Sequence, residues 1–188
     1  TRIQASNLTP FSDSTTLTRE GELRFSGDDT NTAEIDALLY QFPLGERTTV
    51  TIEANAGAID DFTDTVNTYL DGDGGYGALT HFATRNPIYY LLNGTGVGLR
   101  HEFNDNLELS LGYLANAAND PGPDNGLFNG PYGAIAQLTF KPSETLTLGL
   151  TYIHAYNNDF TANGSVGSNN ANLSNLGLPF STNAYGVG

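Results

Sequence analysis

The chain has 188 residues, and its 21 acidic and 7 basic residues give a formal net charge of −14 at pH 7. Because such a chain has no basic stripe to meet phosphates, nucleic-acid binding is excluded as its general role. It contains no run of about 18 apolar residues, which excludes a transmembrane helix, and no cysteine, which excludes disulfides and a thiol nucleophile. Fold and function must therefore be read from the patterning of the remaining residues.

The first elements in chain order are strand-like. Residues 1–7 alternate like a strand from the first position, and the pattern predicts that another strand begins near Tyr185. We therefore expect the chain to be a piece of a longer protein. A loop-like stretch, residues 9–31, follows the first of these strands.

The next strand, residues 33–42, allows two orientations. If Phe42 lies on the apolar side with Tyr40 and Leu38, then Asp36 is carried to that side as well. If Leu39 lies there with the other odd-numbered residues, the acidic residues are hidden but Phe42 is inverted. A bulge between Asp36 and Leu38 would satisfy both patterns, and the sequence does not choose between them.

Five further stretches alternate with a period of two residues, which indicates strands with one apolar and one polar or small side. The first covers residues 49–56, where Val50 and Ile52 oppose Thr51 and Glu53. The clearest four begin at Thr95. Their apolar sides carry Val97, Leu99, His101 and Phe103; Leu107, Leu109, Leu111, Tyr113 and Ala115; Tyr132, Ala134, Ala136, Leu138 and Phe140; Leu146, Leu148, Leu150 and Tyr152.

Three tight turns, at residues 42–46, 103–106 and 140–144, alternate with four long connections, at residues 9–31, 59–93, 116–131 and 157–182. This arrangement predicts eight strands with one short-turn end and one long-loop end. Each clear strand is about ten residues long, enough to cross a bilayer when tilted, and aromatic residues bracket the Leu/Ala band on the apolar side. The pattern predicts an all-β fold, a transmembrane antiparallel β-barrel.

The small residues on the polar side indicate how large the barrel is. Gly96, Gly98, Gly112, Gly133 and Gly149 would leave the interior of an eight-stranded barrel poorly filled. We therefore interpret residues 1–188 as a partial porin barrel, about half of a larger, water-filled structure. Two alternatives remain open: a soluble all-β binding module of adhesin or lectin type, and an outer-membrane receptor barrel with a plug or an outer-membrane enzyme.

Several segments carry a family resemblance. The stretch from Gly126 to Pro142, the following Leu148 to Asn157, Tyr40 to Gly45 and Asp73 to Tyr89 resemble cyanobacterial outer-membrane porins of the carbohydrate-selective OprB type, also described as iron uptake porins. The resemblance implies a barrel of about sixteen strands in the outer membrane, commonly trimeric. It also implies a leader and a domain that binds the cell wall, both outside this chain, and passive diffusion of small solutes and ions without catalysis.

The connection formed by residues 59–93 is the longest and most acidic, and loops of that length are usually functional or disordered. We hypothesise that it folds into the barrel and narrows the pore, with Asp73, His81 and Arg85 facing permeating solute. The alternative is a surface flap packed on its own aromatic residues. The residues predicted to line the lumen on the strands are Glu53, Arg100, Glu102, Glu108, Gln137 and Thr151.

The remaining motifs point to no chemistry. Asp71, Asp73 and their glycines resemble the start of a calcium loop, but the twelfth position is Phe82 rather than a bidentate Glu. Gly72, Gly74 and Gly77 lack the strand and helix of a dinucleotide site. The three histidines have no metal-ligand spacing. We therefore predict no catalytic residues, no metal and no cofactor, and a mild cation preference from the acidic excess.

Overall fold

A computed structural model describes residues 1–10, 30–67, 69, 85–120, 122–157 and 179–188. In these residues the chain forms one antiparallel sheet of eight strands, in which each strand pairs with its neighbours in sequence. The all-β, eight-stranded prediction is confirmed. The strands are β1 (Arg2–Gln4), β2 (Glu34–Pro43), β3 (Thr48–Ala58), β4 (Asn93–Asn104), β5 (Leu107–Ala115), β6 (Tyr132–Ser143), β7 (Leu146–Asn157) and β8 (Phe180–Val187).

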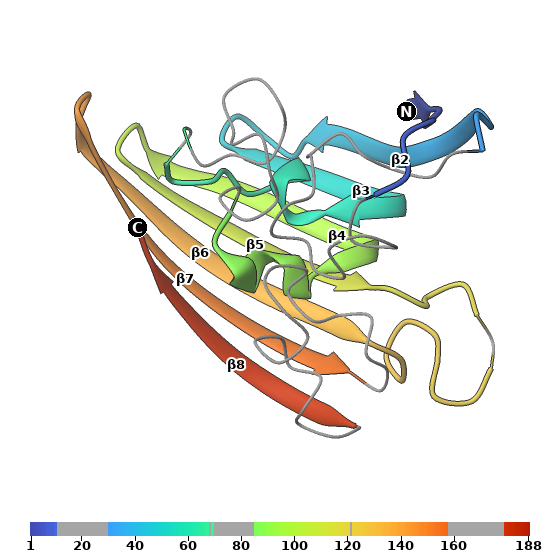
Figure 1. Cartoon of the computed structure of the whole chain (residues 1–188). Coiled ribbons are helices and arrows are strands. Elements are labelled where there is room, and N and C mark those ends of the chain that lie inside the picture. Colours follow the sequence, from blue (N-terminus) through green and yellow to red (C-terminus); the bar gives the residue numbers. More distant parts are fainter. Residues whose placement is uncertain (11–29, 68, 70–84, 121, 158–178) are drawn as a thin grey trace.

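The sheet is strongly curved and does not close on itself within the described residues (Figure 1). The short turns after β2, β4 and β6 lie at one end of the sheet, and the long connections leave from the other end. Residues 59–67 and 85–92, which precede β4, lie over the concave side of the sheet. We call this side the inner face and the convex side the outer face.

Strand register keeps the two faces chemically distinct, because residues paired directly across an antiparallel sheet point to the same face. Leu109 pairs with Leu138 on the outer face, whereas Gln137 pairs with Ser110 and with Thr151 on the inner face. On the outer face Leu111, Leu138, Leu148 and Leu150 are exposed, Leu150 to 58%, while Ser110, Gln137 and Thr151 on the inner face are buried. The usual polarity of a water-soluble protein is thus inverted along these strands.

The orientation of β2 is resolved by its pairing with β3. Phe42 lies opposite Val50, and Tyr40 opposite Ile52, so both aromatic residues point to the outer face. The register shifts on both edges of β2 close to the predicted bulge. Against β1, Asp36 is the additional residue between two successive pairs, and it forms an ion pair with Arg2. Against β3, the shift falls between Leu38 and Leu39.

Two short 3-10 helices flank the undescribed centre of the connection, η2 (Ile59–Asp61) and η5 (Pro87–Leu91). Pro87 and the Asn86 side chain, which accepts a hydrogen bond from the Ile88 backbone N–H at 3.2 Å, define the start of η5. No helix in the described part of the chain has the length and hydrophobicity needed to span a membrane. The buried core lies between the connection and the inner face, and comprises Ile59, Phe62, Tyr89, Leu91, Leu92, Leu114, Ile135, Ile153 and Ala155.

The inverted polarity predicts different costs for a charge on the two sides of β7. If the outer face contacts lipid, as the strand pattern predicts, Leu150→Arg in the full-length protein should lower the free energy of unfolding by about 2–4 kcal/mol, because it would place a cation against acyl chains. Thr147→Arg, on the inner face of the same strand, should change it by less than about 1 kcal/mol. Urea unfolding followed by electrophoretic mobility measures both values. Equal losses in the two variants would contradict the assignment of the faces.

Candidate functional site

The first arm of the connection, residues 59–67, packs directly on the backbone of the inner face. A Cβ atom at Gly98 would lie 2.1 Å from Cγ of Phe62, and one at Gly112 would lie 2.2 Å from its Cε2 atom. The Phe62 ring therefore occupies the space that side chains on β4 and β5 would fill. Only glycine at these two positions permits so close an approach.

The same contact recurs along the sheet. A Cβ atom at Gly149 would lie 2.3 Å from Val66, and one at Gly133 would lie 2.4 Å from Leu92. Leu92 belongs to the second part of the connection, residues 85–92, which we call the returning arm. This arm therefore also reaches the inner face. We call Gly98, Gly112, Gly133 and Gly149 the glycine track. The space left by these small inner-face residues is filled, in the described part of the chain, by side chains of the connection.

Charged groups add to these contacts on the first arm. The Arg100 side chain donates from Nη2 to Oδ1 of Asp64 at 2.7 Å and from Nε to the carbonyl oxygen of Phe62 at 3.3 Å. Its Nε also lies 3.6 Å from Oε1 of Glu108. Because the Arg100 and Asp64 side chains are 29% and 59% exposed, their ion pair is worth no more than about 1 kcal/mol.

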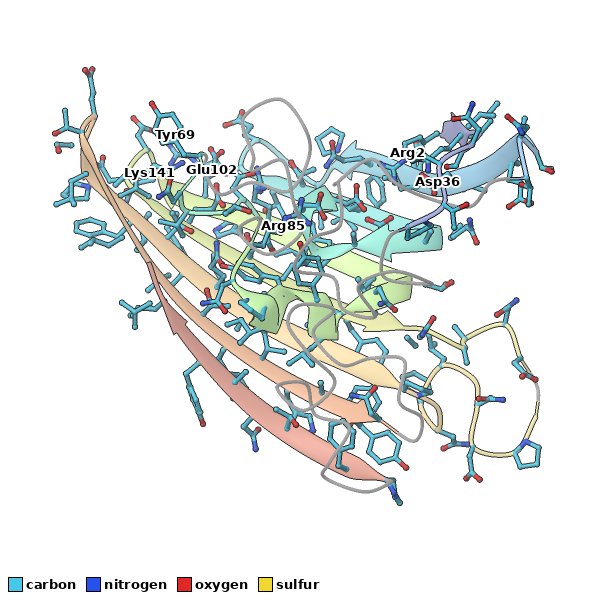
Figure 2. The ribbon with its side chains drawn as sticks, in the orientation of Figure 1. Arg2, Asp36, Tyr69, Arg85, Glu102 and Lys141 are labelled. Carbon is cyan, nitrogen blue, oxygen red and sulfur yellow. The ribbon has the colours of Figure 1, made fainter. Side chains whose placement is uncertain are left out.

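A second ion pair joins the two arms to each other. Nη2 of Arg85 lies 2.7 Å from Oδ2 of Asp60, and the Arg85 side chain is only 7% exposed. Figure 2 shows Arg85 over the concave side of the sheet, whereas Glu102 and Lys141 lie toward the end with the short turns. The neighbouring Asp61 accepts a hydrogen bond from the backbone N–H of Ala58 at 2.9 Å, which fixes the start of η2.

The structure places the predicted lumen residues in different environments. Gln137 and Thr151 are buried under the connection, where Tyr89 contacts both. Glu53 is fully buried, and both its carboxylate oxygens lack a hydrogen-bond partner among the described residues. Arg100 and Glu108 are partly exposed, and Glu102 is exposed.

Of the three predicted constriction residues, Arg85 lies in the paired position described above. Asp73 and His81 lie outside the described residues. Within the described ranges, no three His, Asp or Glu side chains gather into a group that could hold a metal ion.

A hollow of about 310 Å³ with both polar and apolar lining lies beside the first arm. Its walls come from the arm, from β6 and from β7, and they carry hydroxyl, carboxylate and ammonium groups. These groups can form hydrogen bonds with a hydrated solute. Its lining residues are Asp60, Thr63, Asp64, Thr65, Val66, Thr139, Lys141 and Thr147.

Sequence reasoning missed Phe62, Asp64 and Tyr89, which make the contacts between the connection and the strands. Nothing local in the sequence marks Phe62 as a residue that docks on β4 and β5. The available signal was the run of inner-face glycines, because glycine inside a strand often marks a close approach by another backbone or side chain. That signal locates the receiving surface but does not say which residue occupies it.

Comparison with known proteins identifies a matching family and two similar proteins. The model of the carbohydrate-selective porin, OprB family, matches residues 1–186. An uncharacterized protein of Nostoc sp. is 35% identical over 211 residues, covering 100% of this chain and 36% of its own length. An uncharacterized protein of Synechocystis sp. is 34% identical over 158 residues, covering 83% of this chain and 28% of its own length. The chain thus spans about a third of these relatives, and no solved structure matches it.

The contact between Phe62 and the glycine track predicts non-additive substitutions. In the full-length protein in lipid, Phe62→Ala should destabilise the first arm by about 3 kcal/mol, and Gly98→Val should displace the ring with a similar effect. Adding Gly98→Val to the Phe62→Ala variant should have little further effect, because the missing ring leaves room for the new methyl groups. Hydrogen exchange of residues 59–67 measures all three variants, and strictly additive effects would show that the ring does not rest on Gly98.

Proposed function

This chain belongs to the carbohydrate-selective porin, OprB family, and from that membership we propose that it forms part of the wall of an outer-membrane porin. Small hydrophilic solutes and inorganic ions would diffuse passively through the water-filled lumen, and no reaction would be catalysed. The observation that carries the proposal is the inverted polarity of the sheet. Exposed leucines line the convex face, whereas polar groups and the connection occupy the concave face.

The outer face supports contact with lipid rather than with another protein layer. No described element covers Leu111, Leu148 or Leu150, each of which is at least 40% exposed. A soluble all-β module would bury such a row against a second sheet. In a bilayer the same row is stable without any covering element, because acyl chains take the place of the second sheet.

We propose that residues 59–93 narrow the pore. In support, both described arms lie on the inner face, held by Phe62, Val66 and Leu92. Asp73 and His81 are proposed to face the solute. The sequence predicted that Arg85 faces solute. We propose instead that Arg85 holds the two arms together through its ion pair with Asp60. Of the residues predicted to line the lumen, Arg100, Glu102 and Glu108 are proposed to meet solute, whereas the buried Glu53, Gln137 and Thr151 are proposed to form the inner face beneath the connection.

Shortening the connection tests this proposal. In the full-length protein, replacing residues 70–84 with a short Gly-Ser linker should raise the single-channel conductance, because less protein would occupy the lumen. The variant must first show the same heat-modifiable electrophoretic mobility as the unaltered protein, which establishes that the barrel has folded. An unchanged conductance in a folded barrel would remove the constriction from the proposal.

The charge of the chain predicts the selectivity of the pore. With a formal net charge of −14 at pH 7, the wall should attract cations, and the partly exposed inner-face carboxylates lie where the field would act. The reversal potential in a KCl gradient should therefore indicate a mild preference for K⁺. Glu102→Gln with Glu108→Gln should reduce that preference, whereas clear anion selectivity of the unaltered protein would contradict the proposed field.

The whole protein is proposed to reside in the outer membrane of a Gram-negative bacterium, and more specifically a cyanobacterium, as both relatives come from cyanobacteria. Its proposed partners are outer-membrane lipid, two further copies in a homotrimer, and the cell wall through a domain outside this chain. Because the chain spans about a third of its relatives, these assignments concern the intact protein. Its mass in native membranes and its binding to isolated cell wall would test them.

A further inference from the structure

The side chain of Gln137 touches both arms of the connection. It lies in β6 on the inner face and is 1% exposed. Its amide oxygen bonds to Tyr89, 48 positions earlier in the sequence, and its amide nitrogen bonds to Asp64, 73 positions earlier. The Gln137 side chain can bond to both arms because its amide carries an acceptor oxygen and a donor nitrogen.

The amide oxygen binds the returning arm. Oε1 of Gln137 accepts hydrogen bonds from the Tyr89 hydroxyl at 2.6 Å and from the Thr151 hydroxyl at 2.8 Å. Burial raises the pKa of Tyr89 above its ordinary value, despite opposing effects of Thr151 and Arg85. The Tyr89 hydroxyl therefore keeps its proton at neutral pH and remains the donor. Thr151 bonds from the neighbouring strand, β7, and orients the amide.

The amide nitrogen binds the first arm. Nε2 of Gln137 donates to the carbonyl oxygen of Asp64 at 2.9 Å and to the Thr139 hydroxyl at 3.4 Å. Both hydrogens of the amide and its oxygen thus have partners. A buried polar group whose bonds are all made specifies one arrangement, because any other arrangement leaves an unpaired group in a water-poor site.

We propose that Gln137 is the positioning residue of the constriction, a neutral clamp that fixes both arms of the connection to the barrel wall. The proposal rests on the proposed function, in which the connection narrows the pore. It goes beyond that function by assigning the rigidity of the narrowed section to one wall residue. Gln137 would act on solute through the arms rather than by touching solute itself.

The clamp differs from the ion pairs in its response to salt. The Arg100–Asp64 ion pair is partly exposed, so mobile ions weaken it. The bonds of Gln137 join neutral groups and are buried, so they should hold the arms equally well in dilute and concentrated electrolyte. Buried bonds between neutral groups would therefore keep the width of the pore independent of the salt concentration.

Three substitutions in the full-length protein separate the two arms. Gln137→Glu keeps acceptors for Tyr89 and Thr151 but loses the donor to Asp64, so it should release the first arm. Tyr89→Phe should release the returning arm. Gln137→Met should release both. The matched control is Gln41→Met, since Gln41 donates to Thr51 on the same face at 3.2 Å and is not hydrogen-bonded to the described residues of either arm.

Hydrogen exchange in lipid, with residues 59–67 and 85–92 followed separately, is the direct test. Gln137→Met should accelerate exchange about tenfold in both segments, and the other two variants in one segment each. The control should leave both segments unchanged, and unfolding in urea should show that all the barrels remain intact. Exchange in Gln137→Met equal to that of the unaltered protein would overturn the clamp.

Single-channel recording then separates this inference from the function on which it rests. Noisier open-channel current in Gln137→Met, at both low and high KCl, would support the clamp within a constriction. Faster exchange with unaltered current would uphold the clamp but refute the constriction. Accelerated exchange confined to one arm in Gln137→Met would overturn the two-armed role of this residue.

Discussion

The period-two alternation of the strands is the constraint on which the rest of the structure depends. Because each strand places successive residues on opposite faces, a register shift of one residue would move every leucine of the outer face inward. The pairs formed by Leu109 with Leu138 and by Ser110 with Gln137 show that the register is kept across β5 and β6. Without it, neither a surface suited to lipid nor a polar surface for the connection would exist.

The inner face receives the connection at positions where the strands carry glycine and therefore no side chain. Glycine within a strand ordinarily weakens it, because it adds flexibility and buries nothing. Here Gly98 and Gly112 allow the Phe62 ring to reach the backbone, and Gly149 does the same for Val66. The buried area lost at each glycine is recovered by a residue of the connection, so the wall and the connection stabilise each other.

The sequence predicted the sheet more completely than the site, for a physical reason. Strand positions and faces follow from local alternation, which Val97 to Phe103 displays plainly, and the eight strands were confirmed. The disturbance near Asp36 was also visible, because an acidic residue interrupted an apolar row. By contrast, the contacts of Phe62 with Gly98 and of Gln137 with Asp64 join distant parts of the chain. Such contacts leave no periodic signal.

The same reasoning explains why Arg85 was expected to face solute. A cation in a long acidic loop resembles a solvated residue, and only the fold brings Asp60 to within 2.7 Å of it. The contacts that hold the connection on the inner face therefore differ in how deeply they are buried. Arg100 with Asp64 is the most exposed, Arg85 with Asp60 is more buried, and Gln137 is almost completely buried. Since screening by mobile ions falls with burial, the bonds of Gln137 should lose less of their strength in concentrated salt than the Arg100–Asp64 ion pair.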